Sequence, residues 1–212
     1  MHWIFALDES GSMFGVRWTK LQNLLGFFKW WLTIWNNFCS QYITAYTFDT
    51  RATLPPAQFY EYVSPSAFNP ATIPINGGGT SFGQALVRGL EFILLRRNID
   101  TCWVIITDGH AAYPDIEIEL FLMVKDYMNN VKGKKVCVLC YHVKRTTETA
   151  PSVFTTMCKK LQAPTYSFKE ANYEVEIAQS LKLESTARIS PQFVKEVAET
   201  VAENKEIIEL AS

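Results

Sequence analysis

Residues 2–12 read HWIFALDESGS, a nearly unbroken apolar run that ends in an acidic residue and a small polar cluster. Such a run predicts a central parallel strand, because a strand covered by helices on both faces is apolar on both sides. Residues 101–109, TCWVIITDG, show the same arrangement of an apolar run followed by polar residues. Parallel sheets bind ligands beyond the carboxyl ends of their strands, so both polar clusters fall where a site is expected.

The rest of the chain alternates between short apolar strands and amphipathic helices, which predicts an α/β fold. We expect a doubly wound, mostly parallel central sheet with helices on both faces. The stretch 50–79 is rich in proline and is expected to supply one short antiparallel edge strand and an irregular loop. The expected strands are 2–8, 42–48, 100–107, 135–143 and 165–168, and the expected helices are 16–38, 81–97, 116–131, 152–161 and 173–183.

The sequence predicts one domain over residues 1–184 and a C-terminal extension, residues 185–212, with an amphipathic helix at 191–210. Apolar residues make up 48% of the 212 residues, enough for a sizeable core, which excludes intrinsic disorder. The first helix is apolar nearly all round. Either the C-terminal helix covers its far side, which we favour, or an aromatic patch is exposed to a partner.

Composition excludes several classes of protein. A net charge of -1 gives no electrostatic footprint for nucleic acid, and no apolar run is long enough for membrane insertion. The five cysteines are an odd number, and the chain shows neither a leader nor a glycosylation sequon, so we expect an intracellular, cytoplasmic protein with free thiols. Cys137 and Cys140 lie three apart in an expected strand and point to opposite faces, so no zinc site is expected there.

Three polar clusters are expected to meet at one edge of the sheet. Asp8, Ser10 and Ser12 follow the first strand, Thr80 follows three glycines and precedes a helix, and Asp108 follows the strand at 100–107. Two carboxylates and three hydroxyls are oxygen-only ligands, which suit Mg²⁺, Mn²⁺ or Ca²⁺ rather than zinc or copper. Each cluster alone is also typical of a turn or a helix cap. Their joint occurrence favours a metal site.

Three segments carry a resemblance to a known family: FALDESGSM at 5–13, GGGTSFGQAL at 77–86 and WVIITDG at 103–109. Together they resemble the von Willebrand factor type A domain, the fold shared with integrin I domains, over about residues 1–184. The resemblance implies that the five residues named above form a metal-ion-dependent adhesion site. It also implies direct ligation by the serines and threonine, aspartates that act through water, and a partner's Glu or Asp that completes the octahedron.

The sequence therefore favours a metal-dependent protein-binding module without enzymatic activity. Glu9, Gly79 and His110 are assigned to the rim that meets the partner, although Glu9 and His110 are more typical of solvated loop residues. A partner could also contact the aromatic first helix or the C-terminal helix. Two alternatives remain: a regulatory or scaffold domain with a structural metal, and a metal-assisted hydrolase. The hydrolase lacks a visible nucleophile–base pair, and of the three histidines only His110 is expected near the site.

Overall fold

The computed structural model describes residues 1–50, 60–143, 150–163 and 165–168, which fall within the compact unit Met1–Lys169. The expected domain boundary at residue 184 and the expected helices at 173–183 and 191–210 lie outside the described residues. They stay predictions.

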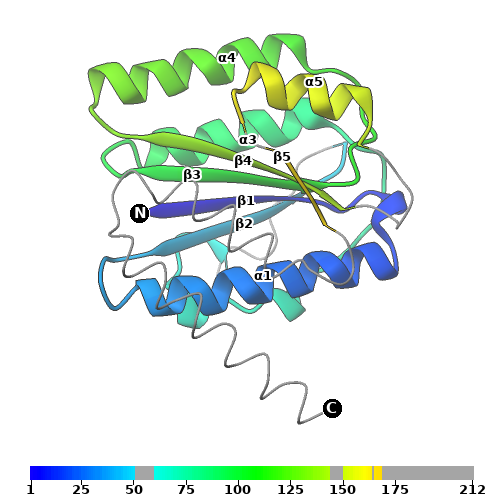
Figure 1. Ribbon diagram of the computed structural model, residues 1–212, viewed down its shortest axis with the longest axis horizontal. Helices are drawn as coiled ribbons and strands as arrows, with labels where there is room; N and C mark the ends of the chain where they lie inside the picture. The colour runs from blue at the N-terminus through cyan, green and yellow to red at the C-terminus, as the bar shows by residue number, and fades with distance from the viewer. Residues whose placement is uncertain (51–59, 144–149, 164, 169–212) are drawn as a thin grey trace. The chain divides into compact units, whose positions relative to one another are not determined.

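The described part of the chain forms a sheet of five parallel strands in the order β2-β1-β3-β4-β5 (Figure 1). The expected strands are confirmed to within one residue at each end. Their bounds are β1 His2–Asp8, β2 Tyr42–Phe48, β3 Thr101–Thr107, β4 Val136–Val143 and β5 Thr165–Phe168.

The four helices expected within this part are also present, and their ends differ from the expected ones by at most three residues when the π-helical turn after the third of them is counted. The first ends three residues early, because Asn36 and Asn37 leave the helix and the side chain of Asn36 accepts a hydrogen bond from the Gln41 N–H at 2.8 Å. None of the described helices combines the length and apolarity that a membrane span requires. The bounds are α1 Val16–Trp35, α3 Phe82–Leu95, α4 Asp115–Asp126 with a π-helical turn at Tyr127–Val131, and α5 Ser152–Lys160.

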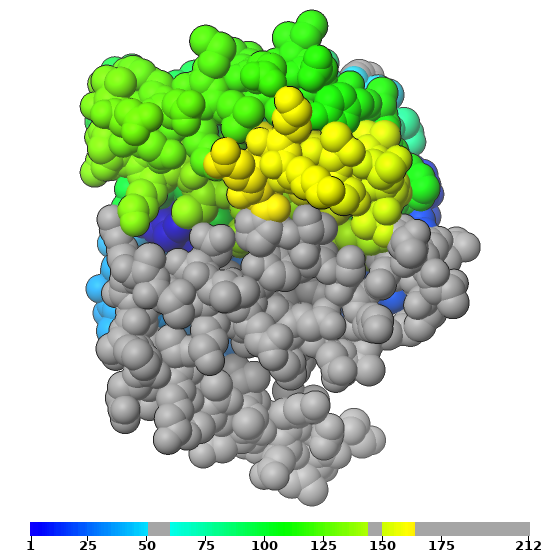
Figure 2. All heavy atoms as spheres, turned by 45° about the horizontal axis from the view of Figure 1, so that its top comes forward, coloured from blue at the N-terminus to red at the C-terminus, as the bar shows by residue number. Residues whose placement is uncertain are grey.

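Helices cover both faces of the sheet, which explains why its strands are apolar on both sides. Ile4 and Ala6 of β1 point into a core that they share with α3, α4 and α5. The alternate residue Phe5 points the other way and contacts Phe28 of α1, with ring centroids 5.0 Å apart. Figure 1 shows α1 on one face of the sheet and the other three helices on the opposite face, and Figure 2 shows α4 and α5 side by side on the surface.

The expected antiparallel edge strand is not seen among the described residues. A single antiparallel bridge joins Ile43 of β2 to Val63, through backbone hydrogen bonds of 2.8 and 2.9 Å. Pairing cannot continue beyond it, because Pro65 has no N–H and begins a 3₁₀ turn, Pro65–Ala67. A second 3₁₀ turn follows at Pro70–Thr72.

The order of the strands reverses direction at one point of the sheet, between β1 and β3. From β1 the chain crosses to β2 on one side, and later it returns to β3 on the other side of β1. The winding therefore reverses between β1 and β3. In open α/β sheets ligands bind beyond the carboxyl ends of the strands at such a reversal. Here those ends carry Asp8 and Asp108.

Candidate metal centre

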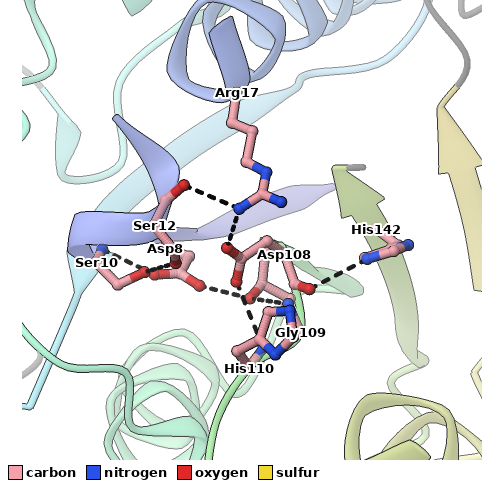
Figure 3. A network of polar contacts seen from close by, with 9 residues as sticks. Asp8, Ser10, Ser12, Arg17, Asp108, Gly109, His110 and His142 are labelled. Atoms are coloured by element: carbon pink, nitrogen blue, oxygen red, sulfur yellow. Dashed lines mark hydrogen bonds and ion pairs between the residues drawn. The ribbon is translucent and has the colours of Figure 1, made fainter. Parts of the chain in front are cut away.

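Asp8 ends β1 as a fully buried carboxylate that its neighbours hold in place (Figure 3). Its Oδ1 accepts a hydrogen bond from the Ser10 backbone N–H at 2.9 Å, and its Oδ2 accepts one from the Thr107 hydroxyl at 2.6 Å. The oxygen of Thr107 in turn accepts the Gly109 N–H at 2.9 Å. The carboxylate is thus fixed to the end of the neighbouring strand β3.

The hydroxyls of Ser10 and Ser12 are hydrogen-bonded to each other at 3.0 Å, at a short 3₁₀ turn, Gly11–Met13. Two adjacent ligands of an octahedral Mg²⁺, each about 2.0–2.1 Å from the ion, are separated by about 2.8–3.0 Å. The two serine oxygens therefore fit neighbouring corners of one coordination sphere.

The charge of Asp8 is poorly compensated by the protein. Burial raises the pKa of Asp8 from 3.8 to about 6, and the nearby charge of Asp108 adds to this effect, against the opposing hydrogen bonds from Thr107 and Ser10. A buried carboxylate whose charged form is disfavoured in this way is stabilised by a positive charge next to it. That is the role that a bound cation would have.

Asp108 already has a positive partner, which the sequence analysis missed. The guanidinium of Arg17, in the first turn of α1, donates through Nη1 to Asp108 Oδ2 at 2.7 Å and to the carbonyl oxygen of Ser12 at 3.0 Å. Both the Arg17 and the Asp108 side chain are buried. One weak signal in the sequence was available: an arginine in the first turn of a helix opposes the helix dipole and is stabilised by a nearby acidic group.

A second missed residue is His142 of β4. Its Nε2 lies 3.1 Å from the backbone carbonyl oxygen of Asp108, so the expectation that only His110 lies near the site was wrong. The parallel register pairs His142 with Thr107, which brings it beside the end of β3. Its side chain is buried and cannot reach a partner protein. The His110 N–H, in contrast, approaches Asp108 Oδ1 at 3.4 Å from an exposed residue.

Glu9 also departs from its expected place. It was assigned to the rim or to solvent, yet its side chain is fully buried. Its Oε2 accepts two hydrogen bonds from Asn76, from the backbone N–H at 3.2 Å and from Nδ2 at 3.0 Å. The carboxylate therefore holds the loop that precedes α3 and is not free to meet a partner. Gly79 and His110, the other expected rim residues, are exposed.

The loop that carries Thr80 is brought to the serine motif by backbone contacts. The Gly11 N–H donates to the carbonyl oxygen of Gly78 at 3.1 Å. Gly78 has a φ of +135°, and a Cβ there would lie 2.8 Å from Asp49 Oδ2, so only glycine fits. Thr80 is partly buried and, within the described residues, forms no hydrogen bond with the other expected ligands. Its role as a ligand stays a prediction.

The residues that do converge fit a hard cation. Two aspartates and two serines offer only oxygen, which suits a hard cation. The described residues hold no group of three or more His, Cys, Asp or Glu that could bind a metal ion, so any site here depends on the serine hydroxyls as well. The buried guanidinium of Arg17 works against a cation, since it already occupies an oxygen of Asp108.

A scan of the sequence finds no matching family model, and no curated protein is significantly similar. Solved structures are similar in fold at low identity. A von Willebrand factor type A protein from Catenulispora acidiphila is 13% identical and matches with a TM-score of 0.60 over 83% of this chain and 40% of its own. The vWF domain of the type V pili tip protein Mfa5 from Porphyromonas gingivalis is 10% identical, with a TM-score of 0.58 over 86% and 95%. The conserved hypothetical protein BatB from Bacteroides thetaiotaomicron is 15% identical, with a TM-score of 0.57 over 89% and 100%. The chain therefore has a fold like that of von Willebrand factor type A domains.

Proposed function

We propose that this protein is a metal-ion-dependent protein-binding module. A Mg²⁺ ion, or Mn²⁺ or Ca²⁺ in its place, binds at the carboxyl edge of the sheet and captures a Glu or Asp side chain of a partner protein. The observation that carries the proposal is the 3.0 Å separation of two serine hydroxyls beside two buried aspartates, at the reversal of the sheet. The proposed ligands are Asp8, Ser10, Ser12, Thr80 and Asp108.

Each proposed ligand has a distinct task. Ser10 and Ser12 supply neutral oxygens, and the two aspartates supply the negative charge, directly or through water. The bound cation supplies the electrostatic attraction for an acidic group. Among the dication, Arg17 and the two aspartates, the formal charges are three positive and two negative, while the buried carboxylate of Glu9 is turned to Asn76. The surplus positive charge favours a carboxylate over a water molecule in the remaining position.

Other observations support a binding module. The similar Mfa5 domain belongs to a pilus tip protein. His142 is buried and faces a backbone carbonyl, so it does not offer a general base for hydrolysis. We also propose an intracellular location, which is supported by the odd number of cysteines, five in all.

The experiment that tests the proposal is affinity capture on the immobilised protein with Mg²⁺, in parallel with a chelator. Columns of Asp8→Ala and Thr80→Ala protein are run beside the wild type, with Ser66→Ala, an exposed serine on a distant turn, as the matched control. We expect proteins that bind to the wild type and the control only when Mg²⁺ is present. Removal of one charge-assisted contact should weaken binding by about 1.5–3 kcal/mol, or about ten- to a hundredfold.

The same eluate in Mg²⁺ and in chelator would refute metal-dependent capture. Loss of binding by Asp8→Ala with loss of the circular dichroism spectrum of the fold would instead favour a structural metal. The Asp8→Ala variant is therefore checked for folding before its binding is interpreted.

A further inference from the structure

Arg17 places a permanent positive charge among the residues proposed to hold a cation. Its Nη1 donates to Asp108 Oδ2 at 2.7 Å and to the Ser12 carbonyl oxygen at 3.0 Å, so both acceptors belong to proposed ligand residues. The side chains are only 9% and 0% exposed, which leaves the pair weakly screened by solvent. A guanidinium does not lose its proton in proteins, so this charge persists at every working pH.

The position of Arg17 favours the pairing. It is the second residue of α1, at the end of the helix where the dipole disfavours a cation. Removing a guanidinium from water is also costly unless an opposite charge is close. Asp108 supplies that charge. Conversely, Asp108 is a buried carboxylate whose charge is balanced by Arg17 while no metal ion is bound.

We propose that Arg17 competes with the divalent cation for Asp108 and thereby couples metal binding to partner binding. The inference rests on the proposed function of the site. With the metal absent, Arg17 and Asp108 form a satisfied pair. A cation that enters meets the positive charge of Arg17 and is held weakly. A carboxylate from the partner removes the surplus positive charge, so metal and partner each bind more tightly in the presence of the other.

The coupling makes the occupancy of the metal site depend on the partner, which a site with higher affinity for the metal would not do. A site that holds its ion firmly presents it whether or not a partner is near. A site with an internal competing charge is loaded mainly when an acidic group arrives with the ion. Arg17 would thus make recognition depend on both the metal and the acidic partner.

The test compares the affinity of Mg²⁺ and Mn²⁺ for three variants of the chelator-stripped protein by titration calorimetry. Arg17→Gln removes the charge, and Arg17→Lys retains it. Lys29→Gln makes the same change of charge further along α1 and is the matched control. Arg17→Gln should bind the metal about ten- to a hundredfold more tightly than the wild type. The Arg17→Lys and Lys29→Gln proteins should stay close to the wild type.

A second readout, the melting temperature in chelator, does not depend on metal binding. In chelator, Arg17→Gln should melt at a lower temperature than the wild type, because Asp108 loses its buried partner. Saturating Mg²⁺ should restore most of this loss, since the cation then balances Asp108. If Arg17→Gln fails to fold, the wild type still tests the coupling: it should bind Mg²⁺ more tightly in acetate than in chloride at equal ionic strength.

The outcomes separate this inference from the proposed function. Wild-type protein that binds metal as tightly as Arg17→Gln overturns the role of Arg17 and leaves metal-dependent binding intact. Equal metal affinity in acetate and chloride overturns the coupling and also counts against capture of a carboxylate by the metal. Metal binding by Arg17→Gln alone supports the competition but overturns metal-dependent function of the natural protein. Absence of binding in both proteins overturns both proposals.

Discussion

Replacement of Asp8 by asparagine is expected to make the metal-free protein more stable, although Asp8 is buried and hydrogen-bonded. Burial, together with the charge of Asp108, raises the pKa of Asp8 from 3.8 to about 6. Because the pKa is higher in the folded than in the unfolded state, this group favours folding below about pH 4, and that contribution is lost as the pH rises through 6.

The magnitude follows from the size of the shift. A shift of about two units corresponds to about 3 kcal/mol in favour of an uncharged group at about pH 7.5. Asparagine keeps the shape but replaces the acceptor of the Thr107 hydroxyl by an N–H group, which costs about 1–2 kcal/mol. The net gain is about 1–2 kcal/mol, which raises the melting temperature of a domain of this size by about 2–8 °C.

The assay is thermal unfolding followed by circular dichroism in chelator, with Asp126→Asn at an exposed position of α4 as the control. The control should change stability by less than about 0.5 kcal/mol. Saturating Mg²⁺ should reverse the order, because only the wild type gains about 2.7 kcal/mol at a metal concentration of about 100 Kd. Asp8→Asn protein that is less stable than the wild type in chelator would refute the claim that the buried negative charge of Asp8 destabilises the metal-free fold.

Two further predictions concern the stability of the fold. His2 is buried, and burial, together with the positive charges of Arg96 and the amino terminus, lowers its pKa to about 3. The folded state resists protonation there, so stability should fall by up to about 1.4 kcal/mol per unit as the pH decreases from about 6.5 to 3. The free energy of unfolding, measured with urea at several pH values, should change less steeply with pH in His2→Gln than in the wild type. An equal dependence on pH in the two proteins would show that His2 is not the responsible group. Gly78→Ala should cost about 1–3 kcal/mol and weaken stabilisation by Mg²⁺, because a Cβ there meets Asp49. Gly133→Ala, with φ at +62° and nothing within 4 Å, should cost only about 1 kcal/mol, and equal losses would argue against a close approach at Gly78.

The strands were predictable from the sequence because burial on both faces leaves a continuous apolar run for each of them. His2–Asp8 and Tyr42–Phe48 have the predicted bounds for this reason. The edge strand was not predictable in the same way. Whether Val63 extends into a strand or stops at one bridge depends on Pro65, and on pairing with Ile43 twenty positions earlier in the sequence.

The site was predictable where topology alone determines it and not where side chains meet over long separations. The ends of β1 and β3 are neighbours in any sheet of this winding, which brings Asp8 near Asp108. Glu9 and Asn76 are 67 positions apart, and Arg17 and Asp108 are 91 apart. No local pattern of hydrophobicity contains such pairs. For this reason Glu9 was misplaced and Arg17 was missed.

The bridge at Val63 protects the outer edge of β2 from unwanted strand addition. An open strand edge offers unpaired N–H and C=O groups to any other extended chain, which is a route to aggregation. Here Val63 occupies both groups of Ile43, the Tyr62 N–H donates to the Thr44 hydroxyl at 3.0 Å, and the ring of Tyr62 stacks on that of Tyr42 at 4.2 Å. An incoming strand must break these hydrogen bonds and separate the rings before it can pair. Partner chains are thereby discouraged from adding to this edge of the sheet.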